Sequence, residues 1–383
     1  MGFPVSSYLL IKLASRCNLA CSYCYWFRDS TVYQSPPLMS ADVEDALVEK
    51  LGLHVRKHRL PDFNCIFHGG EPMLFGLKRF RNLVAKLEAM GAEVESRIDF
   101  SITTNGVLVT PEWADFFYRH DVRVAVSIDG PQAIHDKSRP TLRGAGSFLD
   151  AVRGYKLLKE AGVEPSIIAV CDPGSNPLEL LQFFVEDLDC RQFDVLPPDL
   201  NHDDNVKPIA DYYIKLFDAW YENYFDQGVR VRFLMSLIRS VLGAEANSDS
   251  FGYGPLHTIS LGTNGTLEPN DVLRIAGSKR TATKTDIRSS SLDDVINEAA
   301  WQEAYNSALS LCSQCETCKY RNECGGGHLA HRWSRERSYD NPTVYCNDMI
   351  RMFDHVKARV AADVSMEFPE SNGMFERNLN VTI

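Results

Sequence analysis

The stretch Tyr8-Leu-Leu-Ile-Lys-Leu-Ala-Ser-Arg-Cys17-Asn-Leu-Ala-Cys21-Ser-Tyr-Cys24 joins an apolar run to three closely spaced cysteines. The run Tyr8–Leu13 predicts a β-strand, and the cysteines follow it with the spacing C-x3-C-x2-C. Cysteine thiolates hold iron–sulfur clusters, and three of them leave one iron of a cubane without a protein ligand. We therefore expect a [4Fe–4S] cluster whose open iron takes a cofactor or substrate. A structural zinc site, the alternative, needs a fourth ligand, but no Cys or His follows within ten residues.

Similar strands recur outward along the chain and alternate with amphipathic helices. We expect five further strands at Phe63–Phe67, Ile98–Thr103, Arg123–Ile128, Ser166–Val170 and Phe193–Leu196. Apolar residues at helical spacing lie between them, as in residues 43–55 after the capping residue Ser40. Six strands with intervening helices imply parallel βαβ units. The fold class is therefore α/β, a partial (β/α)6 TIM-like barrel.

The chain changes character after the sixth strand. Residues 205–250 predict a helical bridge, and a hairpin is expected around Thr263-Asn264-Gly265. A cysteine-rich segment follows, and a final helix is expected over Val344–Val364. We expect three parts: the barrel over residues 1–204, the bridge over 205–250, and a smaller C-terminal iron–sulfur domain over 251–383.

Composition excludes several classes of protein. The 383 residues, 44% hydrophobic and 24% charged, indicate a globular protein. A net charge of −11 argues against a nucleic-acid partner. No apolar run is long enough to span a bilayer and no secretory signal opens the chain, so we expect a cytoplasmic protein without a membrane partner. Eight of the eleven cysteines gather within Cys17–Cys24 and Cys312–Cys346. Such clusters indicate metal rather than disulfides.

Polar or glycine-rich motifs follow the next three predicted strands. They are His68-Gly69-Gly70-Glu71-Pro72, Thr103-Thr104-Asn105-Gly106 and Ser127-Ile128-Asp129-Gly130. In parallel α/β barrels the C-terminal strand ends form the active-site face, so these motifs and the cysteines meet at one rim. Glycine permits close backbone approach, and Glu71 could pair with an ammonium group. Each motif alone could be an ordinary turn, but their common register with the cysteines favours a site.

These motifs resemble the radical S-adenosylmethionine superfamily over about residues 5–200. In that family the open iron chelates the amino and carboxylate groups of S-adenosylmethionine. The resemblance implies that the backbone of Tyr23 meets the adenine and that Arg139 pairs with the cofactor carboxylate. It assigns cofactor binding to Tyr23, Gly69, Gly70, Glu71, Thr104, Asn105, Ser127, Asp129 and Arg139.

The second cysteine group resembles the SPASM extension of radical enzymes that modify ribosomal peptides. That extension normally carries two auxiliary clusters. Here the outer set is complete, with Cys315, Cys318, Cys324 and Cys346, which implies one auxiliary [4Fe–4S] cluster. The inner set is depleted, and His257, Asn270 and His328 mark the vacancy. Cys312 has no assigned place. Zinc on the outer cysteines is the alternative.

The resemblance implies a maturase that abstracts hydrogen from a ribosomal precursor peptide. Cys324-Gly-Gly-Gly-His328-Leu-Ala-His331-Arg332, with Asn270-Asp271, looks most like the three-residue cyclophane synthases, which join an aromatic ring to a Cβ. Asp271 is then either the catalytic base or an ordinary turn residue. An external one-electron reductant of the flavodoxin or ferredoxin type is expected. Formylglycine-forming sulfatase maturases and thioether-forming enzymes are alternatives, as are a non-catalytic electron carrier and a zinc-stabilised binding module.

Overall fold

The computed structural model describes residues 5–246, 248–254 and 258–367, so the expected vacancy residue His257 lies outside it. Contacts group the chain into two compact units: residues 1–168 with 255–306, and residues 169–254 with 307–383. The expected boundaries after residues 204 and 250 remain a prediction. What the contacts add is that the segment 255–306 packs with the first strands, although it lies far along the chain.

The strands of the first unit are parallel, as expected for βαβ units. They are β1 (Tyr8–Ala14), β2 (Asp62–Gly69), β3 (Arg97–Thr104), β4 (Arg123–Ser127) and β5 (Ser166–Val170), which begins there. Each pairs with its neighbour in this order. The predicted strands are confirmed to within two residues at either end. Buried side chains, chiefly phenylalanine and isoleucine, fill alternate positions of β2 and β3.

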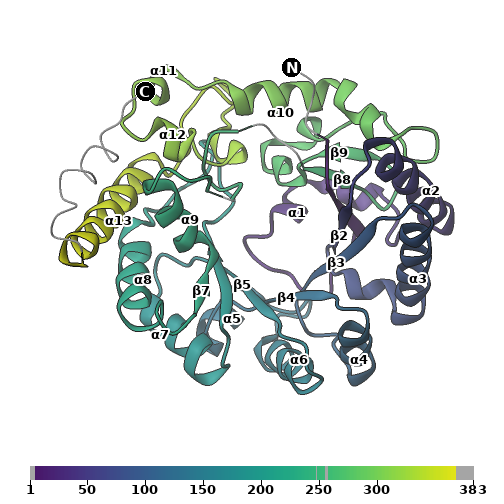
Figure 1. The fold of residues 1–383 in the computed structure, drawn as a ribbon, viewed down its shortest axis with the longest axis horizontal. Helices are drawn as coiled ribbons and strands as arrows, with labels where there is room; N and C mark the ends of the chain where they lie inside the picture. Colours follow the sequence, from purple (N-terminus) through teal and green to yellow (C-terminus); the bar gives the residue numbers. More distant parts are fainter. Residues whose placement is uncertain (1–4, 247, 255–257, 368–383) are drawn as a thin grey trace. The chain divides into compact units, whose positions relative to one another are not determined.

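Helices separate these strands, and Figure 1 shows α2, α3, α4 and α6 along the outer side of β1–β4. The helices are α1 (Tyr25–Arg28), α2 (Ala41–His58), α3 (Leu77–Glu93), α4 (Pro111–Arg119), α5 (Gln132–Ser138) and α6 (Phe148–Glu160). The short 3₁₀ turns are η1 (Ser30–Gln34), η2 (Pro72–Phe75), η4 (Asp271–Ala276), η5 (Ser278–Arg280) and η6 (Leu292–Asn297). Proline opens α4 at its first position, where its missing N–H costs nothing.

A hairpin from the distant segment completes the first unit. β8 (Ile259–Leu261) pairs parallel with β1 and antiparallel with β9 (Leu267–Pro269). This confirms the turn expected around residues 263–265. Because η4 follows β9 directly, the hairpin delivers Asp271 to the C-terminal half of β1.

The second unit contains two paired parallel strands, β6 (Gln192–Leu196) and β7 (Arg230–Val231). Its helices are α7 (Pro177–Gln182), which runs into the π turn η3 (Phe183–Asp187), α8 (Ala210–Asn223), α9 (Arg232–Val241), α11 (Ser313–Glu316), α12 (Arg321–Cys324) and α13 (Cys346–Glu367), with the 3₁₀ turn η7 (Leu329–Arg332). α10 (Ala299–Leu309) runs from the first unit into the second.

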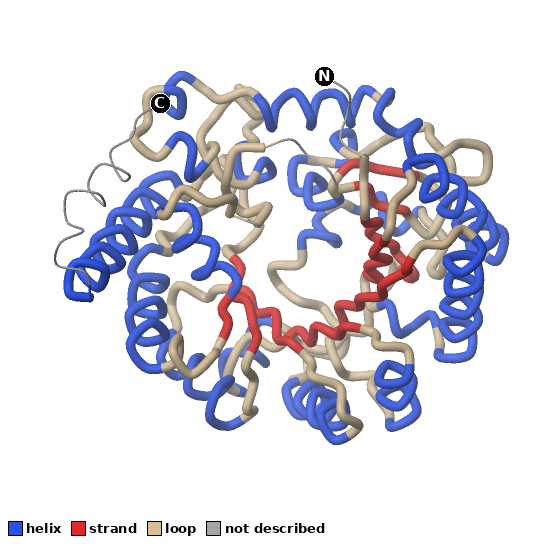
Figure 2. Tube along the Cα trace, viewed as in Figure 1, coloured by secondary structure: helices blue, strands red, loops and turns tan. Residues whose placement is uncertain are grey.

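Residues 205–250 contain the expected helices as α8 and α9, with the two residues of β7 between them, and their role as a bridge remains a prediction. The final helix is confirmed as α13, which packs on α8 and α9. Figure 2 shows the helices, strands and loops of each unit in separate colours. Among the described helices, none combines the length and hydrophobicity needed to cross a bilayer.

Candidate active site

The three cysteines of the first group lie on the loop between β1 and α1. Cys24 is the N-cap of α1, and none of the three thiols is in a disulfide. Backbone bonds from Ala20 and Ser22 to residues 138–140 hold the loop. Burial raises the pKa of Cys17 to about 12 and of Cys21 to about 11, so both are neutral thiols until a metal takes the charge.

The arrangement of these sulfurs fits a polynuclear cluster better than a single ion. Among the described residues, two groups bring three ligand atoms within 4.8 Å of one another, and neither contains a cysteine. Sulfurs around one tetrahedral zinc would lie about 3.8 Å apart, given bonds of about 2.3 Å. N–H groups also point at sulfur, as in Leu19 N to Cys17 Sγ at 3.4 Å. Such bonds tune iron–sulfur clusters. The residues therefore fit the expected [4Fe–4S] cluster.

The double glycine after β2 supports this cysteine loop. A Cβ on Gly69 would overlap the Ala14 carbonyl oxygen, and one on Gly70 would overlap the Arg16 carbonyl group. Gly70 N donates to Ala14 O, and Glu71 N donates to Arg16 O, both at 2.9 Å. These glycines are thus required by the backbone that leads into Cys17. Their expected contact with the cofactor amino group remains a prediction.

Glu71 joins the ends of two strands. It is fully buried, and its carboxylate accepts from Met73 N at 3.0 Å, Thr104 Oγ1 at 2.8 Å and Asn105 N at 2.8 Å. Burial raises its pKa to about 7, against these three bonds. Asn105 also reaches the cysteine loop, because its Nδ2 donates to Asn18 Oδ1 at 2.7 Å and lies 3.8 Å from Cys17 Sγ.

The predicted residues Tyr23, Asp129 and Arg139 meet in one group. The guanidinium of Arg139 donates to both Asp129 oxygens, at 2.9 and 3.1 Å, and Tyr23 Oη donates to Asp129 Oδ2 at 2.6 Å. Ser127 is buried at the end of β4, two residues earlier. Asp129 therefore positions the arginine. The pairing of Arg139 with the cofactor carboxylate remains a prediction.

Asp271 belongs to a buried polar group. Its carboxylate forms an ion pair with Lys12 Nζ and accepts from Tyr25 Oη at 2.8 Å. Lys12 Nζ lies 3.0 Å from His68 Nδ1, and the two residues stand opposite each other in β1 and β2. Burial alone would raise the pKa of Asp271, but Lys12, with His68 and Tyr25, holds it below its usual value. Asp271 is therefore held as an ionised carboxylate by its neighbours.

Lys12, Tyr25 and His68 carry no functional role in the sequence analysis. Lys12 had a signal, since it is the one charge inside an apolar strand. Tyr25 directly follows Cys24, and His68 precedes the double glycine. Their common partner Asp271 lies more than 200 residues away, so no local pattern joins them.

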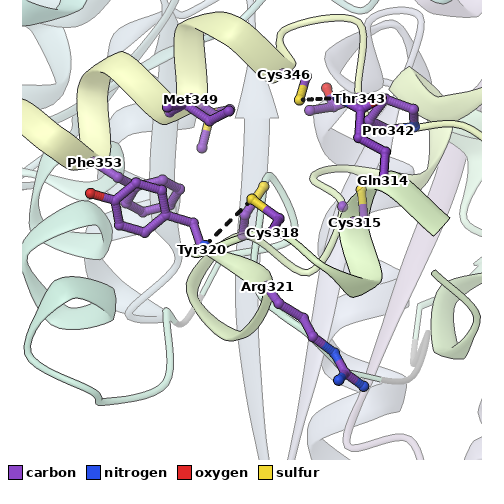
Figure 3. A pocket seen from close by; sticks show the side chains of 13 residues that line it. Gln314, Cys315, Cys318, Tyr320, Arg321, Pro342, Thr343, Cys346, Met349 and Phe353 are labelled. Carbon is purple, nitrogen blue, oxygen red and sulfur yellow. Dashed lines mark hydrogen bonds between the residues drawn. The ribbon is translucent and has the colours of Figure 1, made fainter. Parts of the chain in front are cut away.

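The second cysteine group surrounds a cavity of about 140 Å³ in the second unit. Cys315, Cys318, Cys324 and Cys346 all line it. Figure 3 shows sulfurs from the loop near α11 and from the start of α13 around this space. Apolar side chains complete the wall: Tyr320, Met349, Ile350 and Phe353. Tyr320 N donates to Cys318 Sγ at 3.4 Å and Gln314 Nε2 to Cys346 Sγ at 3.6 Å.

Cys312 is buried and contacts Cys315 without lining the cavity. Burial raises the pKa of Cys315 and of Cys324 to about 12. Four free thiols around one cavity, two of which accept from N–H donors, fit the auxiliary [4Fe–4S] cluster, which remains a prediction.

Comparison with known proteins decides the class. The model of the radical SAM superfamily matches residues 11–184. The chain is a radical S-adenosylmethionine enzyme. Its cofactors are a [4Fe–4S] cluster and S-adenosylmethionine, and a non-catalytic carrier and a zinc-stabilised binding module are set aside.

The enzyme is similar to a cysteine-type anaerobic sulfatase-maturating enzyme of Clostridium perfringens, with 25% identity over 93% of this chain and 98% of that protein. It is 34% identical to a serine-type anaerobic sulfatase-maturating enzyme of Bacteroides thetaiotaomicron, over 51% of this chain and 47% of that protein. The structure of native anSMEcpe with bound AdoMet and Cp18Cys peptide shares the fold, with a TM-score of 0.80, 24% identity and coverage of 94% of this chain and 99% of that chain. This confirms the α/β partial barrel.

Proposed function

We propose that the enzyme is a maturase that oxidises one residue of a peptide or protein chain. The observation that carries this proposal is the buried carboxylate of Asp271, which accepts a hydrogen bond from Tyr25, the residue that follows Cys24. A carboxylate next to a radical-generating site can take the proton that an oxidation releases. The similar proteins named above act as maturases, and one is bound to a peptide in its structure.

The relatives favour formylglycine formation over the cyclophane crosslink that the sequence suggested. In formylglycine formation a cysteine or serine side chain loses one hydrogen atom from Cβ, one electron and one proton. The serine product is then the aldehyde, whereas the cysteine product is a thioaldehyde that water converts to the aldehyde and hydrogen sulfide. The bound cofactor would supply the carbon radical that removes the hydrogen atom. An iron–sulfur cluster held by the outer set of cysteines would accept the electron.

The chain's own residues would manage the proton. Asp271 accepts it at Oδ2 or Oδ1, and Lys12 and Tyr25 hold the carboxylate ionised and oriented beforehand. Burial of this group excludes competing water, which strengthens each electrostatic contact. Glu71 and the double glycine hold the cysteine loop in place for the redox step.

A cyclophane synthase is the second candidate. The observation in its favour is His328 at the position where the SPASM pattern has a cysteine, together with Asn270. Crosslinking removes as many electrons and protons as formylglycine formation does. A ring C–H bond and a Cβ–H bond are broken, and two electrons and two protons are lost in total. The precursor peptide, the external one-electron reductant and the cyclophane bond remain predictions.

The test supplies two peptides to the anaerobically reconstituted enzyme. One carries a single cysteine or serine, and the other carries an aromatic residue two positions before an aliphatic one. Formation of 5′-deoxyadenosine together with an aldehyde that reacts with a hydrazide would support the maturase of the first type. Loss of two hydrogens without an aldehyde would identify the crosslinking type. Absence of modification on any peptide from the enzyme's genetic neighbourhood, with active cofactor cleavage, would contradict both.

A further inference from the structure

Three side chains that can ligate a metal, none of them a cysteine, come together. Asp199, His328 and His331 each place one ligand atom within 4.8 Å of the others, and all belong to the second unit. His328 is 7% exposed and His331 is 4% exposed. His331 Nε2 lies 3.3 Å from Asp199 Oδ1. Two ligand atoms bound to a tetrahedral ion at about 2.0–2.1 Å lie about 3.3 Å apart.

The local backbone explains why the two imidazoles face the same way. They have the spacing H-x2-H across the 3₁₀ turn η7, and side chains three residues apart eclipse in a 3₁₀ helix. Their ring centroids are 4.9 Å apart. The preceding glycines, residues 325–327, all have positive φ and turn the chain from Cys324 into η7.

Neighbouring contacts fix the group rigidly. The buried guanidinium of Arg332 donates to four backbone carbonyl groups of the residues around it. Tyr345 Oη donates to Pro198 O at 2.8 Å, which holds the loop that carries Asp199, and its ring packs on His331 at 5.3 Å. Preorganised ligands of this kind characterise built metal sites.

His328 has a buried nitrogen that the protein leaves unsatisfied. Its Nδ1 has no hydrogen-bond partner among the described residues. Its Nε2 lies 4.0 Å from Asp249 Oδ2, beyond hydrogen-bond length. An unpaired buried nitrogen is unfavourable, and a bound cation would satisfy it.

The first unit offers a contrasting group of the same composition. His54, His58 and Asp293 also converge. There both carboxylate oxygens are within 3.0 Å of an imidazole nitrogen, and Lys57 Nζ lies 2.7 Å from Oδ2. The ammonium repels a cation and already neutralises the carboxylate. That group joins α2 to η6 through ion pairs, and it serves as a matched control for metal binding.

We propose that His328, His331 and Asp199 bind one Zn²⁺ ion, whose fourth ligand is water. Two imidazoles and a carboxylate suit zinc among the common divalent cations. The ion would tie the loop after β6 to the turn that follows Cys324, a ligand residue expected for the auxiliary cluster. This site is independent of the peptide chemistry proposed above.

The experiment measures zinc in the full-length enzyme with its iron–sulfur clusters reconstituted anaerobically. Titration against a chromophoric chelator should show about one tight zinc site per chain. Zinc K-edge absorption spectroscopy should show nitrogen and oxygen neighbours at about 2.0–2.1 Å and no sulfur. A sulfur shell at about 2.3 Å would place the zinc on the cysteines and overturn the proposal.

Variants locate the ion. His331→Gln and Asp199→Asn should weaken zinc binding by more than the roughly 10- to 100-fold that loss of an outer-shell partner causes. His58→Gln, in the control group, should leave the affinity unchanged. Asp199 is partly exposed, so its variant should fold even if the histidine variant does not. Added zinc should raise the melting temperature of the parent enzyme but not that of Asp199→Asn. Equal affinity in the parent and Asp199→Asn, or no stoichiometric zinc in the parent, would overturn the proposal.

Discussion

At the scale of single residues, Asp271 offers the sharpest test of the proposed function. Asp271→Asn keeps the shape of the side chain but removes the proton acceptor. Hydrogen abstraction precedes proton loss, so 5′-deoxyadenosine should still form while modified peptide falls by about 10² to 10⁴. Quantification of both products by mass spectrometry measures this uncoupling.

The structure adds a control for this variant. Asp271→Asn leaves the buried Lys12 without its counter-charge, which costs about 3–5 kcal/mol. The double variant Lys12→Met, Asp271→Asn relieves that cost and should regain stability without regaining product. Tyr25→Phe removes the hydrogen bond to Asp271 and the longer one from Lys12 Nζ, and should cost about 1 kcal/mol for each. If Asp271→Asn alone makes product at the parent rate, Asp271 is only a turn residue.

Glu71 gives a prediction for pH. Its pKa is raised by burial to about 7, so between about pH 4.5 and 7 the folded enzyme holds a proton that the unfolded chain releases. Stability should therefore fall as pH rises through this window, by about 3 kcal/mol in total. Glu71→Gln should remove that slope and leave a constant offset from its altered hydrogen bonds. Melting temperatures of both proteins from about pH 5 to 8 measure the difference, and parallel curves would contradict the assignment.

At this scale, a contact could be predicted from the sequence when its residues lie close together along the chain. Cys17, Cys21 and Cys24 lie in one short loop, so their spacing alone indicates a cluster. Glu71 and Asn105 follow neighbouring parallel strands, whose C-terminal ends lie side by side. The order of strands and motifs along the chain predicted that these two residues lie at the same rim. Lys12 and Asp271 meet only because the hairpin of β8 and β9 adds to β1. No periodicity encodes that pairing.

At the scale of elements, the loop between β1 and α1 depends on the turn after β2. Gly70→Ala would place a methyl group against the Arg16 carbonyl group, whose backbone leads directly into Cys17. The loop must shift, so the variant should fold but retain fewer irons on the first cysteine group. Gly254→Ala is the matched control, since no atom of the described residues lies within 4 Å of its Cβ position. Iron content after reconstitution measures the effect, and equal retention in both variants would contradict it.

Helices and strands could be predicted where their hydrophobic pattern extends over many residues. The strands rich in branched apolar residues and the amphipathic helices match the expectations to within a few residues. β7 was missed because two residues show no alternation, and it forms only by pairing with β6. η7 was missed because a single 3₁₀ turn has no periodic signal, although it aligns His328 and His331.

At the scale of the whole molecule, the two cysteine groups belong to different compact units. The first unit is built from segments at both ends of a long insertion, residues 1–168 and 255–306. Sequence order alone could not reveal this, because the segment 255–306 joins the first unit through the pairing of β8 with β1. Each group has its own hydrogen bonds and its own walls, so each should load with iron independently.

Independent loading makes a stoichiometric prediction. The parent enzyme should hold about eight irons per chain, as two four-iron clusters. Replacement of Cys17, Cys21 and Cys24 by alanine should remove about four and abolish 5′-deoxyadenosine, because these thiols hold the cluster that reduces the cofactor. Cys318→Ser should lose the other cluster, since Cys318 lines the second cavity, while Cys312→Ser should lose none, since Cys312 does not. Iron analysis beside low-temperature electron paramagnetic resonance would read both sites. About twelve irons, undiminished in Cys312→Ser, would require a third cluster and refute the vacancy inferred from Asn270 and His328.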